Sequence, residues 1–532
     1  MNTTMLEKPI ILAVCHLALM SPGFSQKIDL SSLQTRAEAS NYEETARYEE
    51  VMTFAQAVTA VSEKMHLTHF GYTTEGRSLP LIVFGDVPDA SPEAARATNK
   101  TRVFIQANIH AGEVCGKEAM LVLLRNLASG RHSEWRQSVI LLIAPIYNAD
   151  GNERININHR GRQHGPIGGM GQRSNAQGLD LNRDHMKLDS PEARSLVRLF
   201  KRYDPHLVVD LHTTNGTKHA YHLTYSPPLN PNTYPEIDDF LRKQWLPAVT
   251  KTVKKKHGWD IYYYGNLPWR GMNVEKGWYT FDHRPRFNNN YVGLRNRFAI
   301  LSEAYSYASF EERIQATLYF VEEIVNFAAA YSYDILRIVQ EADSHSIVGK
   351  SLALRAQHAR APEPVDILLG EVEEAVNPYS GKTILLRTDV RKAEKMAEYG
   401  TFESTEETAA PQAYYIPKDL KNVMTLLQGH GIQMQPLQRE HRMKVRRFRI
   451  DSTRVAEKEY QGHKQQTLFG VYENSVETMQ TGTVVVPVDQ PLGRLIFYLL
   501  EPRSDDGLVN WGVLNKALEG ADYYPILRSD EN

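Results

Sequence analysis

Short apolar runs alternate with longer stretches of helical spacing along residues 45–330, and this alternation limits the possible folds more than any other feature of the chain. Short apolar runs are typical of strands buried on both faces, and the helical stretches between them cover those faces. The pattern therefore predicts an α/β fold with a mixed, mostly buried sheet flanked by helices. The expected strands are Leu81–Phe84, Val103–Ala107, Val139–Ala144, Leu207–Leu211 and Phe298–Leu301. The expected helices are Lys117–Leu127, Pro191–Arg202 and one or two helices over Phe310–Val339.

The sequence changes in character after about residue 340. The segments "ARAPEPVD" and "STEETAAPQ" are typical of loops, whereas "KVRRFRI" and "GTVVVPV" have the pattern of strands between turns. A chain of 532 residues is also too long for one ordinary hydrophobic core. We therefore expect two domains after any targeting segment: a larger one over residues 26–340 and a smaller, strand-rich one over residues 341–532.

The N-terminus has the pattern of a secretory signal. Lys8 precedes a short apolar stretch, Pro9–Met20, and the small residues Gly23 and Ser25 stand where a signal peptidase cleaves. This predicts a signal peptide over residues 1–25 and a secreted or periplasmic protein. No apolar run reaches the roughly 18 to 20 residues that span a bilayer, so no membrane span is expected. A formal net charge of -2 supplies no basic field for phosphate backbones, so nucleic acid is not an expected partner.

Two expected strands end next to residues that bind metals. The run Val103–Ala107 leads into "NIHAGEVCGKEA", so His110 and Glu113 lie three residues apart in the loop that follows. A catalytic zinc takes three protein ligands and leaves one position open, so a third ligand must come from elsewhere. The run Leu207–Leu211 delivers His212 to the end of another buried strand, where ligands gather in α/β folds, and makes it the best third ligand. The alternatives are His206, His219 and His222.

Two further motifs place polar groups where substrate chemistry needs them. In "LDLNRDH", Asn182 and Arg183 follow a glycine-rich loop. A guanidinium binds a carboxylate through two hydrogen bonds, and the amide donates another, so the motif predicts a carboxylate clamp. In "RFAILSEAYSY", Glu303 directly follows an apolar strand. Partial loss of water there raises a carboxyl pKa, which predicts a general base.

In their order along the chain, these motifs resemble those of the zinc carboxypeptidases of the carboxypeptidase A superfamily, in a bacterial branch with a C-terminal extension. The segments "GYTTEGRSLPL" and "YNADGNE" are similar to landmarks of that family, and the resemblance covers approximately residues 50–330. It implies Arg173 as the group that stabilises the oxyanion, and Asp180 as the carboxylate that orients a ligand histidine. It implies one Zn2+ per chain, held by His110, Glu113 and His212.

The activity that the resemblance implies is hydrolysis of the C-terminal peptide bond of peptides. A zinc-activated water attacks the bond with Glu303 as general base, and Asn182 and Arg183 bind the terminal carboxylate of the substrate. The resemblance further implies that Tyr291 covers the bound substrate, with Tyr279 as the alternative. Arg286 is expected to line the pocket for the substrate side chain and to favour acidic residues.

Two other functions stay open. A zinc amidase or deacylase that acts on N-acyl amino acids or cell-wall peptides uses the same metal site and the same clamp. A catalytically inactive binding module would lack a ligand or the base, and the sequence retains both. The expected partner is therefore a peptide or an N-acyl amino acid with a free carboxylate.

Overall fold

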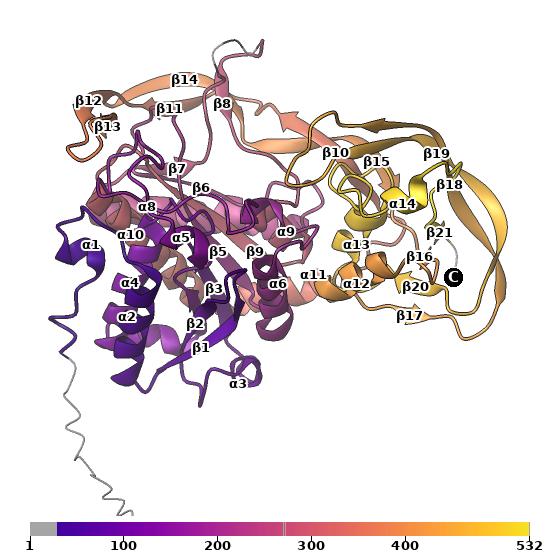
Figure 1. Ribbon diagram of the computed structural model, residues 1–532, viewed down its shortest axis with the longest axis horizontal. Helices are drawn as coiled ribbons and strands as arrows, with labels where there is room; N and C mark the ends of the chain where they lie inside the picture. The colour runs from indigo at the N-terminus through magenta and orange to yellow at the C-terminus, as the bar shows by residue number, and fades with distance from the viewer. Residues whose placement is uncertain (1–28, 270, 272, 531–532) are drawn as a thin grey trace, which may run out of the picture.

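A mixed eight-stranded sheet forms the centre of the protein, and the computed structural model describes residues 29–269, 271 and 273–530. The strand order is β1-β2-β4-β3-β5-β9-β6-β7 (Figure 1). The central strands β4, β3, β5 and β9 run parallel, whereas β2 is antiparallel to β1 and β4, and β6 is antiparallel to β9. The strands of this sheet are β1 Met65–Tyr72, β2 Ser78–Phe84, β3 Thr101–Ala107, β4 Val139–Ala144, β5 Leu207–Thr213, β6 Leu223–Ser226, β7 Ile261–Tyr263 and β9 Phe298–Ala304.

Helices cover both faces of the sheet. Successive residues of a strand point to opposite faces, and β3 follows this rule: Val103 and Ile105 belong to one apolar cluster and Phe104 to the other. The helices over the first face are α2 Tyr48–Ala60, α4 Cys115–Ala128, α8 Leu246–His257, α10 Phe310–Ala330 and α11 Ser332–Ser344. The helices over the second face are α6 Pro191–Tyr203 and α9 Asn288–Leu294. The predicted mixed, mostly buried sheet flanked by helices is confirmed.

Local sequence signals begin and end these helices. The hydroxyl of Ser190 accepts a hydrogen bond from the backbone of Ala193, Pro191 opens α6, and Asp204 ends it in the left-handed conformation. The segment expected to form one or two helices forms α10 and α11, which meet at Tyr331. The shorter helices are α1 Arg36–Ala39, α3 Pro92–Arg96, α5 Ala149–Glu153, α7 Pro235–Phe240, two 3-10 turns at Ser133–Gln137 and Leu181–Arg183, and a π-helical turn at Leu241–Trp245.

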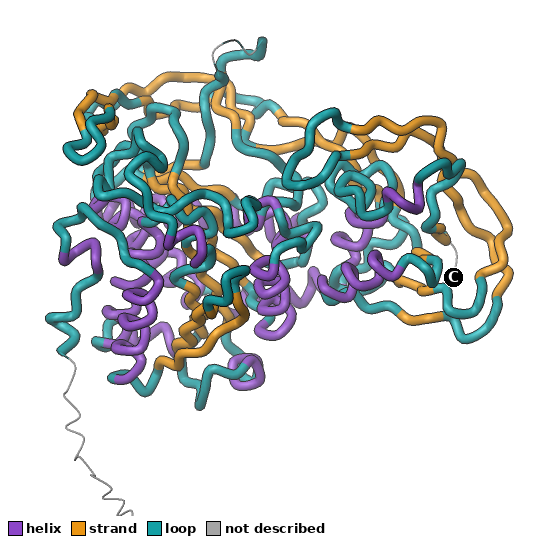
Figure 2. Tube along the Cα trace, viewed as in Figure 1, coloured by secondary structure: helices purple, strands orange, loops and turns teal. Residues whose placement is uncertain are grey.

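The chain after α11 is rich in strands, as Figure 2 shows. The expected strand in "KVRRFRI" lies in β18, and the one in "GTVVVPV" lies in β20. The strands of this C-terminal region are β10 Ser351–Ala359, β11 Val365–Leu369, β12 Val372–Val376, β13 Thr383–Arg387, β14 Lys392–Tyr399, β15 Thr401–Ala409, β16 Ala413–Ile416, β17 Gln435–Pro436, β18 His441–Val455, β19 Gln466–Met479, β20 Val484–Pro487 and β21 Leu527–Ser529. Its helices are α12 Lys421–His430, α13 Gly493–Leu500 and α14 Asn515–Leu518.

Several contacts join the C-terminal region to the rest of the molecule. Strand β8 (Gly277–Tyr279) pairs in parallel with β14, and the second apolar cluster continues from α6 and α9 into α12 and α13. A buried ion pair of 2.7 Å links Arg286 to Asp506. Position 340 falls within α11, so the division into two domains at that residue stays a prediction.

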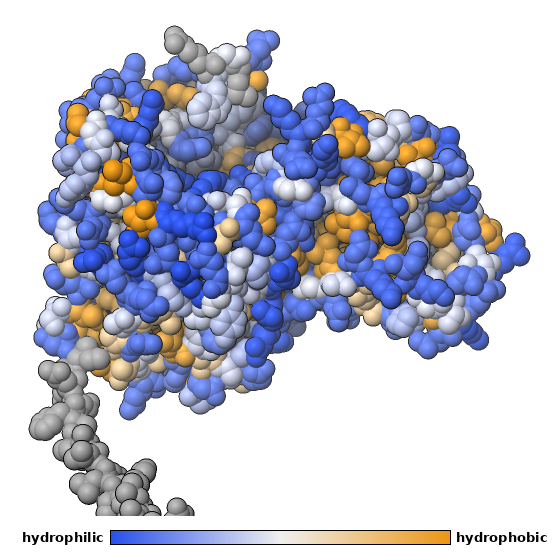
Figure 3. All heavy atoms as spheres, viewed as in Figure 1, coloured by the Kyte–Doolittle hydropathy of each residue, from blue (hydrophilic) through white to orange (hydrophobic). Residues whose placement is uncertain are grey.

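The surface and the N-terminus bear on where the protein is found. Among the residues that the structure describes, no helix has the length and apolar character that crossing a membrane requires. Hydrophilic residues cover most of the face shown in Figure 3, and its apolar residues gather in small patches. The predicted signal peptide, residues 1–25, lies outside the described residues.

The parallel strands β3, β5 and β9 end at the same edge of the sheet. Ala107 in β3 pairs with Leu211 in β5, and His212 in β5 pairs with Glu303 in β9. Side chains that end or follow these three strands therefore converge, which is how ligand sites form in sheets of this kind.

Candidate metal centre

The loop between β3 and α4 carries His110 and Glu113. Asn108 begins the loop in the left-handed region with φ of 67°, and the backbone N of Glu113 donates to the carbonyl of His110 at 2.8 Å. A Cβ at position 112 would lie 2.8 Å from the carbonyl oxygen of Gly171 and 3.2 Å from the Arg160 side chain. The close approach of these groups explains why glycine occupies position 112.

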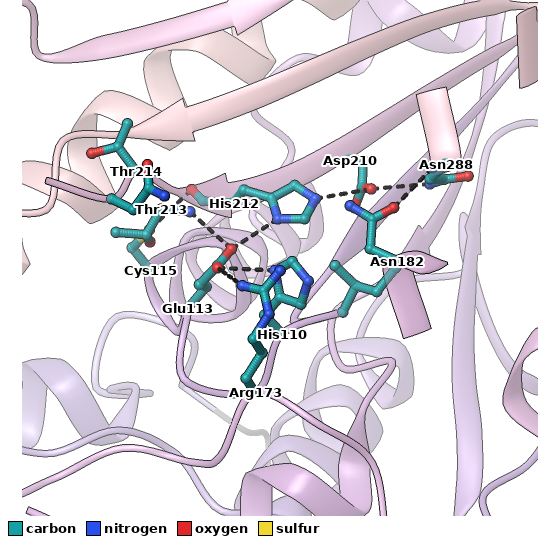
Figure 4. A network of polar contacts seen from close by, with 12 residues as sticks. His110, Glu113, Cys115, Arg173, Asn182, Asp210, His212, Thr213, Thr214 and Asn288 are labelled. Atoms are coloured by element: carbon teal, nitrogen blue, oxygen red, sulfur yellow. Dashed lines mark hydrogen bonds and ion pairs between the residues drawn. The ribbon is translucent and has the colours of Figure 1, made fainter. Parts of the chain in front are cut away.

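Three candidate ligand atoms meet at the sheet edge. Nδ1 of His110 lies 2.9 Å from Oε1 of Glu113, and Nδ1 of His212 lies 2.8 Å from Oε2 of the same carboxylate (Figure 4). The three side chains are buried, and their ligand atoms all lie within 4.8 Å of one another. Two imidazoles and one carboxylate form the protein donor set of many catalytic zinc sites. The group could therefore hold a metal ion and leave a coordination position for substrate.

A carboxylate stands behind each imidazole. Nε2 of His110 lies 3.0 Å from Oδ1 of Asp180, and Nε2 of His212 lies 3.0 Å from Oδ2 of Asp210. Metal-binding histidines generally donate their remote N–H to such a group, which leaves the other ring nitrogen for the metal. The donor set therefore fits zinc. Sequence reasoning missed Asp210. Asp210 and His212 are two residues apart in β5, and such residues lie on the same face of a strand, so this spacing could have identified Asp210 as a partner of His212.

The electrostatics of the cluster favour a bound cation. Burial opposes the charged form of His212, but Asp210 and Glu113 outweigh it and raise the pKa of the ring well above its ordinary value. Burial would also raise the pKa of the Glu113 carboxyl, yet Arg160, His110 and His212 hold it well below its usual range. A buried carboxylate that stays charged by collecting positive partners provides a site for a divalent metal ion.

Glu303 lies beside the metal ligands at the end of β9. Its Oε2 is buried and has no hydrogen-bond partner in the described part of the chain. Loss of water raises the pKa of this carboxyl, and Glu113 adds to the effect, against the opposing charge of His212. An unpaired buried carboxylate costs stability, so its presence in a cavity is typical of a functional group.

Most of the predicted site residues line one cavity of about 310 Å³. The predicted residues that line it are His110, Glu113, Arg173, Asn182, Arg183, His212 and Glu303. Asp180 lies behind the lining and contacts His110, as described above.

Asn182 and Arg183 each present a donor to the cavity. Oδ1 of Asn182 accepts from the backbone N of Asn288 at 2.8 Å, and because that N–H can only donate, Nδ2 of Asn182 is the group left over. Nε of Arg183 donates to the hydroxyl of Tyr460 at 2.9 Å, and Nη1 donates to the carbonyl of Asn182 at 2.7 Å. Nη2 of Arg183 has no hydrogen-bond partner among the described residues. Two free donors on one wall are suited to a carboxylate.

Arg173 places a second guanidinium in the cavity, beside that of Arg183. Its Nε and Nη2 lie 3.0 and 2.9 Å from Oδ2 of Asp180, and its Nη1 lies 3.6 Å from Oε1 of Glu113. The side chain is 46% exposed, so the guanidinium is fixed by Asp180 and still faces the cavity.

Two predicted substrate contacts are corrected by the structure. Tyr291 is fully buried in α9, and its hydroxyl contacts Nδ1 of His430 at 2.7 Å, so it cannot cover a substrate without leaving the core. Arg286 is also buried, where it pairs with Asp506, and it does not line the cavity. The tyrosine that does line the cavity is Tyr264, whose hydroxyl accepts from Nδ2 of Asn266 at 2.9 Å.

Sequence reasoning also missed Arg160, which lines the cavity and forms a close ion pair with Glu113. No local pattern marked it, because it reaches the site from a long loop.

The alternative metal ligands lie elsewhere. The ring of His206 accepts a hydrogen bond from the backbone of Arg102 at the opposite end of β5, and His219 and His222 are buried outside the cavity lining.

The chain is similar in sequence to known carboxypeptidases. Residues 51–281 match the zinc carboxypeptidases of peptidase family M14. A carboxypeptidase 2 of Trichophyton rubrum is 22% identical over 477 residues, which cover 85% of this chain and 81% of the relative. A carboxypeptidase E of Caenorhabditis elegans is 29% identical over 189 residues, 34% of this chain and 38% of the relative. A solved metallo-carboxypeptidase from Burkholderia cenocepacia has a TM-score of 0.41 at 17% identity, over 54% of this chain and 70% of that chain. The Trichophyton relatives are fungal, so the expected bacterial branch is not supported.

Proposed function

We propose that this chain, whose residues 51–281 belong to the zinc carboxypeptidase family, hydrolyses the C-terminal peptide bond of peptides. The observation that carries the proposal is that Nδ2 of Asn182 and Nη2 of Arg183 share a cavity with the His110, Glu113 and His212 cluster. A free terminal carboxylate accepts from both donors and is attracted by the charge of the guanidinium, so these donors favour a substrate that ends in a carboxylate.

The metal and its supports form the first part of the mechanism. His110, Glu113 and His212 would hold the zinc, which when bound would supply a Lewis acid for the scissile carbonyl and for the attacking water. Asp180 and Asp210 fix the two rings through their Nε2 atoms, so that both Nδ1 atoms face Glu113.

Glu303 and Arg173 carry out the proton transfer and the charge stabilisation. The unpartnered carboxylate of Glu303 removes a proton from the attacking water and delivers it to the departing amine. Arg173, held by Asp180 and open to the cavity, places its charge where the oxyanion develops. The proposal is supported by the fact that both side chains line the cavity of the metal cluster without a bound substrate.

The class of substrate is tested by changing only the terminus. A blocked dipeptide, its C-terminal amide and an N-acyl amino acid are compared at equal concentrations, with zinc content measured in the same sample. A carboxypeptidase cleaves the free acid and leaves the amide nearly untouched. Equal rates on acid and amide would contradict the clamp, and faster cleavage of the N-acyl amino acid would favour the amidase alternative.

The proposal includes export from the cell. It is supported by the pattern of Lys8, Pro9–Met20 and the small residues before position 26. N-terminal sequencing of the protein recovered outside the cytoplasm should begin at Gln26. A mature protein that retains Met1 would contradict cleavage.

A further inference from the structure

A tight turn from the C-terminal region reaches the carboxylate clamp. Strands β18 and β19 form a long antiparallel hairpin, and the segment that joins them contains a turn over Tyr460–His463. The backbone N of Tyr460 donates to the carbonyl of His463 at 2.8 Å, and the reciprocal bond is 3.1 Å. Gln461 and Gly462 between them have φ of 52° and 78°, the geometry of a type I′ turn. The tip of the turn is therefore well fixed.

Two side chains of this turn bind the short helix Leu181–Arg183 at both of its ends. Oε1 of Gln461 accepts from the backbone N of Asp180 at 2.8 Å, and the hydroxyl of Tyr460 accepts from Nε of Arg183 at 2.9 Å. These partners are 281 and 277 residues apart in the sequence. The contacts therefore make a distant part of the chain a neighbour of the clamp.

The hydroxyl of Tyr460 completes the fixation of the Arg183 guanidinium. The guanidinium carbon lies 3.9 Å from the centroid of the Phe287 ring, which sets its plane. Nη1 of Arg183 donates to the carbonyl of Asn182, and Nε donates to the hydroxyl of Tyr460. These two bonds determine the orientation of the free Nη2. An arginine held in this way loses little further freedom when a carboxylate binds, and the affinity for that carboxylate is correspondingly higher.

The turn is itself supported from behind. The ring of Tyr460 stacks on Trp511 with centroids 6.2 Å apart, and the buried guanidinium of Arg286 lies 4.6 Å from the Trp511 ring. Nε2 of His463 lies 2.7 Å from Oδ2 of Asp189, which anchors the other end of the turn to the catalytic region. Arg286, predicted from the sequence to touch substrate, instead lies in the support of this turn.

We propose that the Tyr460–His463 turn completes the carboxylate clamp, with Tyr460 and Gln461 as positioning residues that fix Arg183 and Asp180 before substrate binds. The inference rests on the proposed carboxypeptidase function, since a clamp has a purpose only if the substrate ends in a carboxylate. Through Tyr460 and Arg183, it assigns the C-terminal region a role in affinity for the terminal carboxylate.

The substitution Tyr460→Phe removes one hydroxyl and keeps the ring on Trp511. In the full-length zinc enzyme, KM for a blocked dipeptide with a free carboxylate should rise about tenfold while kcat stays within about twofold, because the contact is the same in ground and transition states. The low kcat/KM for the C-terminal amide of that dipeptide should not change. The matched control is Tyr523→Phe, whose hydroxyl contacts Glu473 at 3.5 Å in the same region.

Two further measurements separate positioning from stability. The effect of Tyr460→Phe should vanish in an Arg183→Ala background, because coupled residues are not additive. Gln461→Met removes the oxygen that accepts from the backbone N of Asp180 and keeps the length of the side chain. It should also raise KM for the free-acid dipeptide. A variant that is merely less stable loses activity on acid and amide equally, and the ratio between the two substrates stays constant.

The outcomes distinguish this inference from the proposed function. If the unmutated enzyme prefers the acid over the amide, and both turn variants keep its KM, the inference is overturned and the proposed function stands. If the effect of Tyr460→Phe persists undiminished without Arg183, the tyrosine does not act through the clamp, and the inference is likewise overturned. If the unmutated enzyme shows no preference for the acid, the clamp itself is refuted and the inference fails with it.

Discussion

The substitution Asp210→Asn tests whether the carboxylate behind His212 sets the affinity for zinc. Asp210 is buried and its Oδ2 lies 3.0 Å from Nε2 of His212, so water screens the interaction only weakly. Asparagine keeps the shape and removes the charge. Loss of an outer carboxylate typically weakens metal binding about 10- to 100-fold, which corresponds to about 1.4 to 2.7 kcal/mol.

The fold should tolerate this change. Asp210 also accepts from Nε2 of Gln106 at 3.3 Å and from Nδ2 of Asn288 at 3.1 Å. Oε1 of Gln106 is buried and has no partner in the described residues, so rotation of that amide supplies an acceptor for the new amide group. A change in zinc affinity would then report on the missing charge and not on unfolding.

The assay is competition for zinc against a chromophoric chelator at fixed pH. The matched control is Asp204→Asn, which lies before the opposite end of β5 and pairs with Arg297 at 2.7 Å. The control should leave the Kd for zinc unchanged. A Kd for Asp210→Asn within about twofold of the unmutated protein would refute the reasoning, since the expected loss is tenfold or more.

Three other predictions concern the clamp, the base and acid stability. Arg183→Ala should lower kcat/KM on free-acid peptides about 10- to 100-fold, through KM, because a charge-assisted contact of about 1.5 to 3 kcal/mol is lost; an equal loss on C-terminal amides would contradict the clamp. Glu303→Gln should keep zinc by metal analysis while kcat falls about 100- to 10,000-fold, and near-normal turnover would exclude Glu303 as the base. In His206, His219 and His430, burial and then a neighbouring arginine lower the ring pKa to about 3, against 6.5 as the ordinary value. Between these values only the unfolded chain gains the proton, so each ring should remove about 1.4 kcal/mol of unfolding free energy per pH unit as pH falls. Urea unfolding at about pH 7.5 and about pH 5 measures this loss, and equal stability at both would contradict it.

The meeting of His110, His212 and Glu303 could be predicted because the sequence marks the ends of buried strands. Each residue ends or follows an apolar run, and such runs in an α/β sheet are mostly parallel and adjacent. The structure places His110 in the loop after β3, His212 on β5 and Glu303 on β9, and these three strands are neighbours in the sheet. Asn182 and Arg183 could be predicted from a different signal, a polar motif that follows a glycine-rich loop.

The remaining site residues depend on contacts that no local pattern encodes. Tyr291 stands in a polar segment, but the rotation of α9 turns it into the core toward His430. Arg160 and Tyr264 reach the cavity from loops whose paths are set by tertiary packing. Tyr460 is 277 residues from its partner in the clamp, so only the folded chain reveals the pairing.

The apolar cluster that passes from α6 and α9 into α13 has a consequence for the synthesis of the protein. The chain leaves the ribosome N-terminus first. The catalytic region therefore emerges well before Gly493–Leu500 can cover it. During that interval the nascent chain exposes the side chains that later pack on α13, and such surfaces recruit chaperones. A message truncated before α13 would therefore produce a polypeptide that aggregates or is degraded. No active protease that lacks the C-terminal region would accumulate.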